Sequence, residues 1–309
     1  MKVRWTIDEQ LSQQQQQITL RDLLQKQWLL PRRFVHFLRI GRRVLLNDHY
    51  QSMNAVVHPG DHVQLNFLGN EFRTATSSYV PSTDPRLNIL YENRDLLVVN
   101  KPAGQKSHPN YDGEPGTLMN DVAGYLKQSS SSSAAYMVHR LDQQTSGAMI
   151  VAKNPVVVPI LDRLISSGQI HRYYLAIVEG SLSPDSGRFS WPIGRDPEDK
   201  RKRMVDGTHA QHALTNYQVL SLGTRASLVK LRLATGRTHQ IRVHLAHSGH
   251  PLVGDPLYNP ASPVKRLMLH GYALRLVLPF SMQTLAIHAP TPRFFKQKLI
   301  DFDLENRTQ

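Results

Sequence analysis

The chain has 309 residues, 40% of them hydrophobic, so it is long enough for a packed core and about two domains. Its 37 Lys and Arg residues exceed its 24 Asp and Glu residues, and the formal net charge of +13 favours a polyanionic partner such as nucleic acid. The absence of cysteine excludes disulfides, thiolate nucleophiles and zinc–thiolate sites.

The first part of the chain predicts a small unit of short strands and two helices. Thr19 is placed to cap a helix that runs through Leu24, with Asp22 at its third position. Pro31 suits the first turn of a second helix over 32–39, which Gly41 ends. Alternating apolar residues predict strands at 3–7, 44–47 and 62–67.

Five arginines of this unit lie close together in sequence: Arg32, Arg33, Arg39, Arg42 and Arg43. Such a cluster predicts a surface that contacts phosphates, and the alternative is a solvated helix face. Residues 70–84 are polar and rich in Ser and Thr, which is typical of a linker. We therefore predict two domains, a small one over 1–80 and a larger one over 85–300.

The larger domain begins with a predicted hairpin, strands 89–91 and 96–99, followed by Lys101-Pro102-Ala103-Gly104. A helix is expected over 117–127, and the serine run 129–133 is expected to be a loop. Further on, Asn154 is placed to cap a helix that has Pro155 at its first position and runs through Ile165.

Between these elements lies the polar stretch His139 to Gly147, followed by the apolar run 148–152. A continuous apolar run predicts a strand covered on both faces. Asp142 then stands where a loop enters a rigid strand, which would hold its carboxylate firmly and leave it open to a ligand. The alternative is a solvated surface turn.

The last third of the chain predicts strands over 171–180 and 228–233, with a charged hairpin tip over 195–203. Two polar blocks follow, Thr235 to Leu245 and Gly249 to Tyr258, and then Leu269-His270. The 15 histidines are scattered and form no H-E-x-x-H motif, so we expect no metal site.

Three of these blocks resemble signatures of the RluA-type pseudouridine synthases. Residues 139–147 match H-R-L-D-x-x-T-S-G, and 235–244 match T-G-R-x-H-Q-I-R-x-H. Residues 172–180 match K-x-Y-x-A-x-V-x-G, with Arg172 in place of the lysine. The shorter blocks also occur in the order of this family, and the first unit resembles an S-four-type RNA-binding domain.

The resemblance implies an α+β fold. Its catalytic domain is a mainly antiparallel, mixed sheet with flanking helices around a basic cleft, preceded by the small RNA-binding domain. The implied reaction converts uridine to pseudouridine in ribosomal or transfer RNA, and it needs no metal, redox cofactor or nucleotide. We expect a cytoplasmic protein, because no apolar run reaches the roughly 20 residues of a membrane span and the N-terminus has no signal peptide. We also expect a monomer.

The resemblance also assigns roles to single residues. Asp142 is the catalytic carboxylate, Arg242 its ion-pair partner, and Tyr174 the tyrosine over the uracil. Arg140 fills the space that the flipped base leaves, and Ile241 walls the pocket. In the first domain, the arginine cluster itself predicts that Arg32 and Arg33 contact phosphates. From the residues alone, core packing would explain Tyr174 as well, and a core role explains Ile241 about equally.

Two other functions compete with this one. A non-catalytic RNA-binding or RNA-folding protein on the same scaffold would not need Asp142, Tyr174 and Arg242 together, and all three are present. A sugar hydrolase would need two paired carboxylates, and only Asp142 stands in a strong motif. The sequence therefore favours the isomerase.

Overall fold

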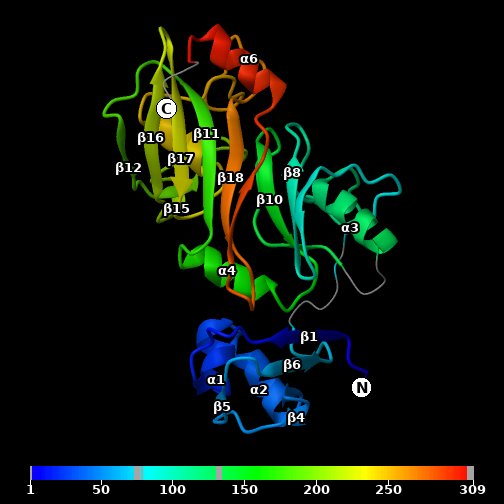
Figure 1. Cartoon of the computed structure of the whole chain (residues 1–309). Helices are drawn as coiled ribbons and strands as arrows, with labels where there is room; N and C mark the ends of the chain where they lie inside the picture. The colour runs from blue at the N-terminus through cyan, green and yellow to red at the C-terminus, as the bar shows by residue number, and fades with distance from the viewer. Residues whose placement is uncertain (1, 73–76, 78, 130–133, 305–309) are drawn as a thin grey trace.

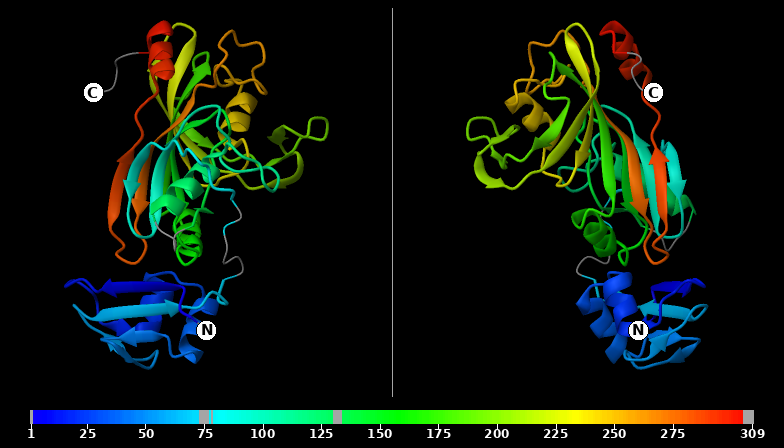
Figure 2. Two further views of the ribbon diagram at one scale, coloured as in Figure 1. Left: turned by 90° about the vertical axis from the view of Figure 1, so that its right-hand side faces the viewer. Right: turned by 60° about the vertical axis from the view of Figure 1, so that its left-hand side comes forward.

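The computed structural model describes residues 2–72, 77, 79–129 and 134–304, and these form two units (Figure 1). The N-terminal unit lies below one end of the larger unit, on the side of helix α4 (Val158–Ser166), in all the views (Figures 1 and 2). Among the described residues, no helix has the length and apolar character that crossing a membrane requires.

The N-terminal unit is built on a four-stranded sheet in the order β1-β6-β3-β4. Its elements in chain order are β1 (Trp5–Gln10), β2 (Ile18–Thr19), α1 (Leu20–Asp22), the π-helix η1 (Leu23–Gln27), α2 (Arg32–Ile40), β3 (Val44–Leu46), β4 (His49–Tyr50), β5 (Val56–Val57) and β6 (His62–Phe67).

The predictions for this unit hold in outline. Thr19 caps α1, since its Oγ1 accepts a hydrogen bond from the Asp22 amide at 3.1 Å. Pro31 occupies the capping position of α2, not its first turn, because its extended backbone places it just outside the helix. The predicted linker 70–84 is wrong at its start, because Glu71 and Phe72 are buried in the N-terminal unit.

The larger unit is built on a ten-stranded sheet. Its elements are β7 (Ile89–Glu92), β8 (Leu96–Lys101), α3 (Leu118–Ser129), β9 (Tyr136–Met137), β10 (Ser146–Ala152), α4, β11 (His171–Glu179), β12 (Ser186–Phe189), β13 (Ile193–Arg195), β14 (Arg203–Val205), β15 (Thr208–Gln211), β16 (Thr215–Leu222), β17 (Ala226–Leu233), α5 (Gln240–His247), β18 (Leu269–Val277), β19 (Thr284–His288) and α6 (Arg293–Asp301).

The sheet has the order β12-β16-β17-β11-β18-β10-β8-β7, with β19 beside β18 and β9 beside β10. Strands β10 and β18 pair in parallel, and its other pairings are antiparallel. The predicted α+β class with a mainly antiparallel, mixed sheet is therefore confirmed. The predicted charged hairpin tip is confirmed as well, since it joins the antiparallel strands β13 and β14.

The apolar run predicted as a doubly covered strand is β10, in which every residue is buried. Its side chains alternate between two cores, because successive residues of a strand point to opposite faces. Ile150 joins the core on the side of α4 and the N-terminal unit. Met149 and Val151 join the core on the side of α3 and α5. This double burial holds the start of β10, and the loop before it, in place.

One helix boundary was predicted wrongly. Helix α4 begins at Val158 and has Pro159 in its first turn, whereas the sequence suggested Pro155. The Asn154 side chain does accept from the amides of Val156 and Val157, at 3.1 and 3.3 Å, but these belong to a turn before the helix. The predicted serine loop 129–133 lies, from residue 130 on, outside the described residues.

Candidate active site

A cleft of about 490 Å³ opens between α4, β11, the N-terminal end of α5 and the loop before β10. Its charged lining includes four arginines and two aspartates: Arg140, Arg172, Arg237 and Arg242, with Asp142 and Asp162. The excess of guanidinium groups makes the cleft basic, as the sequence predicts. A positively charged cleft attracts a polyanion and can bind it with one of its groups inside the cleft.

Asp142 lies in this cleft at the end of a tightly held loop. The Ser107 hydroxyl donates to the Leu141 carbonyl at 2.6 Å and accepts from the Leu141 amide at 3.1 Å. The Thr145 amide closes the turn on the Asp142 carbonyl at 3.1 Å. The Asp142 side chain is 18% exposed, so its carboxylate is fixed by the fold and open to a ligand.

Gly147, just after this loop, permits a close approach of two strands. Its φ of +122° lies in the region that favours glycine. A Cβ at this position would meet the Gly271 carbonyl oxygen at 2.2 Å. Only glycine, which has no side chain, allows β10 to pair with β18 at this position. The position of the Asp142 loop therefore depends on Gly147.

Arg242 holds Asp142 from the opposite side of the cleft. Its Nη1 lies 3.4 Å from Asp142 Oδ2, while its Nε and Nη2 donate to the two carboxylate oxygens of Asp255 at 2.8 and 2.7 Å. Burial disfavours the charge on Arg242, but the hydrogen bonds and the attraction of Asp255, and then Asp142, raise its pKa overall. Arg242 therefore stays charged and fixed in orientation.

The ring of Tyr258 completes this arrangement. The Arg242 guanidinium lies 5.1 Å from the centre of the Tyr258 ring, a cation–π contact. The Tyr258 oxygen is 2.9 Å from Nδ1 of His239, the residue that caps α5. His239 adopts a left-handed backbone with φ of +59°. A strained backbone in a non-glycine residue persists only where the surrounding contacts hold it, and such residues are often found at functional sites.

Tyr174, on β11, forms a buried wall of the same cleft and is 5% exposed. Burial raises its pKa, Arg172 opposes the rise and Asp142 adds to it. Its hydroxyl is therefore protonated at neutral pH. Ile241 packs in the same core as Tyr174 and also lines the cleft.

A model of the RNA pseudouridylate synthase family matches residues 95–247, and a model of the RluD ribosomal pseudouridine synthase N-terminal domain matches residues 8–63. The Bacillus subtilis protein "Uncharacterized RNA pseudouridine synthase YhcT" is 39% identical over 258 residues, which are 82% of this chain and 83% of that protein. The chain belongs to the RNA pseudouridine synthase family.

Other members of the family agree with this result. "Ribosomal large subunit pseudouridine synthase D" of Neisseria meningitidis serogroup A is 35% identical, over 81% of this chain and 69% of its own. The solved structure "Human RNA Pseudouridylate Synthase Domain Containing 4" has a TM-score of 0.57 and 27% identity, and the match covers 70% of this chain and 92% of that one. The predicted enzyme class, an isomerase acting on RNA, is confirmed by this membership.

The cleft brings together five of the seven predicted site residues: Arg140, Asp142, Tyr174, Ile241 and Arg242. Arg140 is exposed in it. The other two, Arg32 and Arg33, lie on the exposed face of α2 in the N-terminal unit. Their predicted roles stay predictions.

The predicted phosphate-contact cluster needs one correction. Arg43 turns inward, where it forms an ion pair with the fully buried Glu71 and donates to the Phe37 carbonyl at 3.0 Å. Its guanidinium is therefore part of the structure of the N-terminal unit. Arg32 and Arg39 remain exposed.

Sequence reasoning gave no role to three residues that support the site: Asp255, Tyr258 and Lys101. Lys101 stands in the stretch Lys101 to Gly104 and the other two in the block Gly249 to Tyr258, so the signal was present. Their partners Gln143, Arg242 and His239 lie outside these stretches. Among the described residues, no group of three or more His, Asp or Glu side chains is arranged to hold a metal ion.

Lys101 fixes the Asp142 loop from beneath. It is fully buried, and its Nζ donates to the carbonyls of Pro102, Gln105 and Gln143 at 2.9, 2.7 and 3.1 Å. Three acceptors match the three donors of an ammonium group. Burial lowers the pKa of Lys101 to about 7, and the attraction of Asp142 opposes this shift.

The Lys101→Met variant is expected to lose about 3 kcal/mol of unfolding free energy, because the three hydrogen bonds from the buried Nζ would be lost. The loop that carries Asp142 would also loosen, so the reaction rate should fall. Urea denaturation and the rate constant at saturating RNA measure the two effects. Lys106→Met is the matched control, because the Lys106 side chain is 35% exposed and pairs with Glu114 and not with the Asp142 loop. Equal effects of the two variants would contradict this role of Lys101.

Proposed function

We propose that this protein isomerises uridine to pseudouridine in ribosomal RNA, with Asp142 as the catalytic carboxylate. The observation that carries the proposal is the ion pair of Asp142 with Arg242, whose guanidinium is itself fixed by Asp255. A carboxylate held in a basic cleft can act on a sugar while the RNA backbone is bound around it.

The reaction rearranges bonds within one nucleotide. The bond between N1 of uracil and C1′ of ribose breaks, and the uracil turns. A bond from C5 to C1′ then forms, C5 loses its proton and N1 gains one. Charge that develops near C1′ is stabilised or bonded by the Asp142 carboxylate. Attack on the sugar and abstraction of a ribose proton are both open to a carboxylate in this position.

The target base must leave its stack to reach Asp142. We assign the buried ring of Tyr174 as the surface against which the extruded uracil packs, since it forms a wall of the cleft near Asp142. The exposed Arg140 stands two residues before Asp142 and is assigned to the space that the base vacates in the RNA. The resemblance also implicates Tyr174 in removing the C5 proton.

Ribosomal RNA is the substrate we favour, because the matching N-terminal model and several relatives carry "ribosomal" in their descriptions. We propose that the unit over 1–80 binds this RNA and that the unit over 85–300 carries the reaction. We also propose that the protein acts as a monomer in the cytoplasm.

Tritium release tests the reaction directly. The purified protein is incubated with in vitro transcripts of large-subunit ribosomal RNA that contain uridine tritiated at C5. Isomerisation replaces the C5 hydrogen by a carbon bond, so tritium appears in water in proportion to pseudouridine formed. Release from this transcript but not from transfer RNA transcripts supports the proposal. Binding without release from either RNA supports the competing non-catalytic RNA-binding function.

The proposed RNA contacts of the N-terminal unit predict a salt effect. Arg32→Ala is expected to weaken RNA binding about equally for different sequences and to lower the slope of log affinity against log salt by about 1. Filter binding at several salt concentrations measures both quantities. Lys26→Ala is a suitable control, because the charge of Lys26 is already balanced by Asp22 at 3.0 Å. An unchanged slope for Arg32→Ala would remove Arg32 from the RNA surface.

A further inference from the structure

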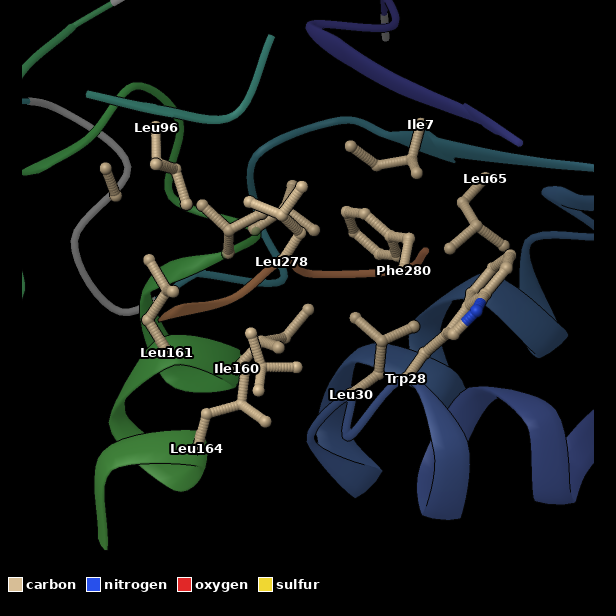
Figure 3. Close-up of a cluster of buried hydrophobic side chains, with 14 of the residues drawn as sticks. Ile7, Trp28, Leu30, Leu65, Leu96, Ile160, Leu161, Leu164, Leu278 and Phe280 are labelled. Carbon is tan, nitrogen blue, oxygen red and sulfur yellow. The ribbon is translucent and has the colours of Figure 1, made fainter. Parts of the chain in front are cut away.

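The two units share one apolar core. The largest cluster of buried side chains contains Trp28 and Leu30 of the N-terminal unit together with Ile160 and Leu164 of α4. Figure 3 shows Leu30 facing these α4 residues, and Phe280 close to Trp28. The rings of Trp28 and Phe280 meet edge to face with centroids 5.3 Å apart, and the residues are 1% and 3% exposed.

Both sides of this contact use strained backbone. Phe280 and Met282, in the turn between β18 and β19, have φ values of +65° and +57°, and Leu29 next to Trp28 has +57°. Large side chains rarely adopt this conformation, so the surrounding packing must hold them in it. This turn places the Phe280 ring in the core that it shares with the N-terminal unit.

Polar contacts reinforce the apolar ones. Arg163 of α4 donates from Nη1 to the carbonyls of Leu29 and Leu30 at 2.7 and 3.2 Å. Arg94 donates to the Asp8 carbonyl at 3.0 Å and pairs with Glu9 at 2.5 Å. These contacts link three backbone carbonyls of the N-terminal unit to side chains of the larger unit.

Helix α4 connects this boundary to the active site. Ile160, Leu161 and Leu164 pack in the shared core, whereas Asp162 and Ser166 line the catalytic cleft. Ile165 lies between the two sets, since it lines the cleft and also packs against the shared core. Their spacing places the two sets on nearly opposite faces of a helix with about 3.6 residues per turn. The chain then passes directly from α4 into β11, which carries Arg172 and Tyr174 into the same cleft.

We propose that the N-terminal unit is a fixed support of the catalytic cleft as well as an RNA-binding surface. It packs against the face of α4 that points away from the cleft. Helix α4 in turn positions the wall of the cleft and the start of β11. Trp28, Leu30, Arg163 and Phe280 are the positioning residues. The proposal rests on the function proposed above and adds that the N-terminal unit contributes to the rate of the chemical step.

A unit that serves only to bind RNA would have different properties. A flexibly tethered module needs only a small, polar contact with its neighbour. The boundary described here is buried and aromatic and is continuous with the core of the central sheet. Since packed cores transmit strain, loosening the boundary should displace α4.

The test compares Trp28→Ala with Trp28→Phe in the full chain. The phenylalanine keeps an aromatic ring against Phe280, and it sacrifices no hydrogen bond, because Trp28 Nε1 is buried without a partner among the described residues. Single-turnover tritium release is measured on the large-subunit transcript with enzyme in excess, over a range of enzyme concentrations. An unfolded fraction shifts the half-saturating concentration but leaves the plateau rate constant unchanged.

For Trp28→Ala we expect the plateau rate constant to fall by about 10-fold or more, since small misplacements of a site are costly. RNA affinity should change little, and Trp28→Phe should restore most of the rate. Arg163→Ala, which removes only the two hydrogen bonds, should lower the plateau in the same direction. Ile40→Ala, at an exposed apolar residue of the N-terminal unit, is the control expected to leave it unchanged.

The proposed function and the proposed support of the cleft can fail independently. If the wild-type protein releases no tritium from any RNA, the proposed function fails. If the wild type reacts and both Trp28→Ala and Arg163→Ala keep the wild-type plateau, the N-terminal unit does not support the cleft. If these variants lower only the affinity for RNA and not the plateau rate constant, the N-terminal unit acts only as an RNA-binding surface.

Discussion

Replacing Asp142 with asparagine is expected to abolish pseudouridine formation while RNA binding survives. The amide has nearly the shape of the carboxylate but lacks its charge and its reactive oxygen. It can therefore neither stabilise positive charge near C1′ nor bond to it. Loss of a catalytic group of this kind typically lowers the rate by a factor on the order of 10⁴ or more.

The structure predicts that this variant folds. Asp142 is 18% exposed, and its partner Arg242 keeps two hydrogen bonds to Asp255 when the carboxylate is neutralised. Tritium release and filter binding, performed on the same preparation, separate chemistry from affinity. Asp112→Asn, at an exposed aspartate that does not line the cleft, is the matched control. A release rate for Asp142→Asn near that of the control would show that another group carries the reaction.

The second large effect is expected at Asp255. This residue is fully buried, binds Arg242 through both carboxylate oxygens and accepts from the amides of Leu257 and Tyr258. Asp255→Ala would leave the Arg242 charge buried with only the 3.4 Å contact to Asp142. Breaking a buried pair by removing one partner typically costs about 3–5 kcal/mol of unfolding free energy. The reaction rate should fall too, because Arg242 would no longer be fixed in orientation.

A double variant distinguishes this explanation from simple loss of packing. In Asp255→Ala with Arg242→Met, no charge is left unpaired at the position of this pair, so part of the lost stability should return while the reaction rate stays low. Urea denaturation of the two single variants and the double variant measures the coupling. A double variant less stable than either single one would mean that the two residues stabilise the fold independently.

Much of this site was predictable from residues that are close in sequence. The loop that carries Asp142 and the strand after it were recognised from a polar stretch followed by a continuous apolar run, and Thr19 was recognised as a helix cap. Each of these features is decided within a few residues by side-chain chemistry and burial. The family resemblance likewise implied the Asp142–Arg242 pair, although the two residues are 100 positions apart.

Other features depend on contacts that no local pattern encodes. Arg43 resembles its exposed neighbours in sequence but is turned inward by Glu71, 28 positions away. Asn154 caps a turn before α4, because Pro159 fits the first turn of a helix that begins at Val158. The shared core of Trp28 and Phe280 joins segments from opposite ends of the chain, and it required the folded structure to be seen.

The central claim is that Asp142, in this cleft, makes pseudouridine in RNA. It is tested most directly by mapping pseudouridine in total RNA from cells that lack the protein and that receive either the wild type or Asp142→Asn. We predict that one or a few ribosomal sites are lost, that the wild type restores them and that Asp142→Asn does not. Restoration by Asp142→Asn, or an unchanged map in cells that lack the protein, would contradict the claim.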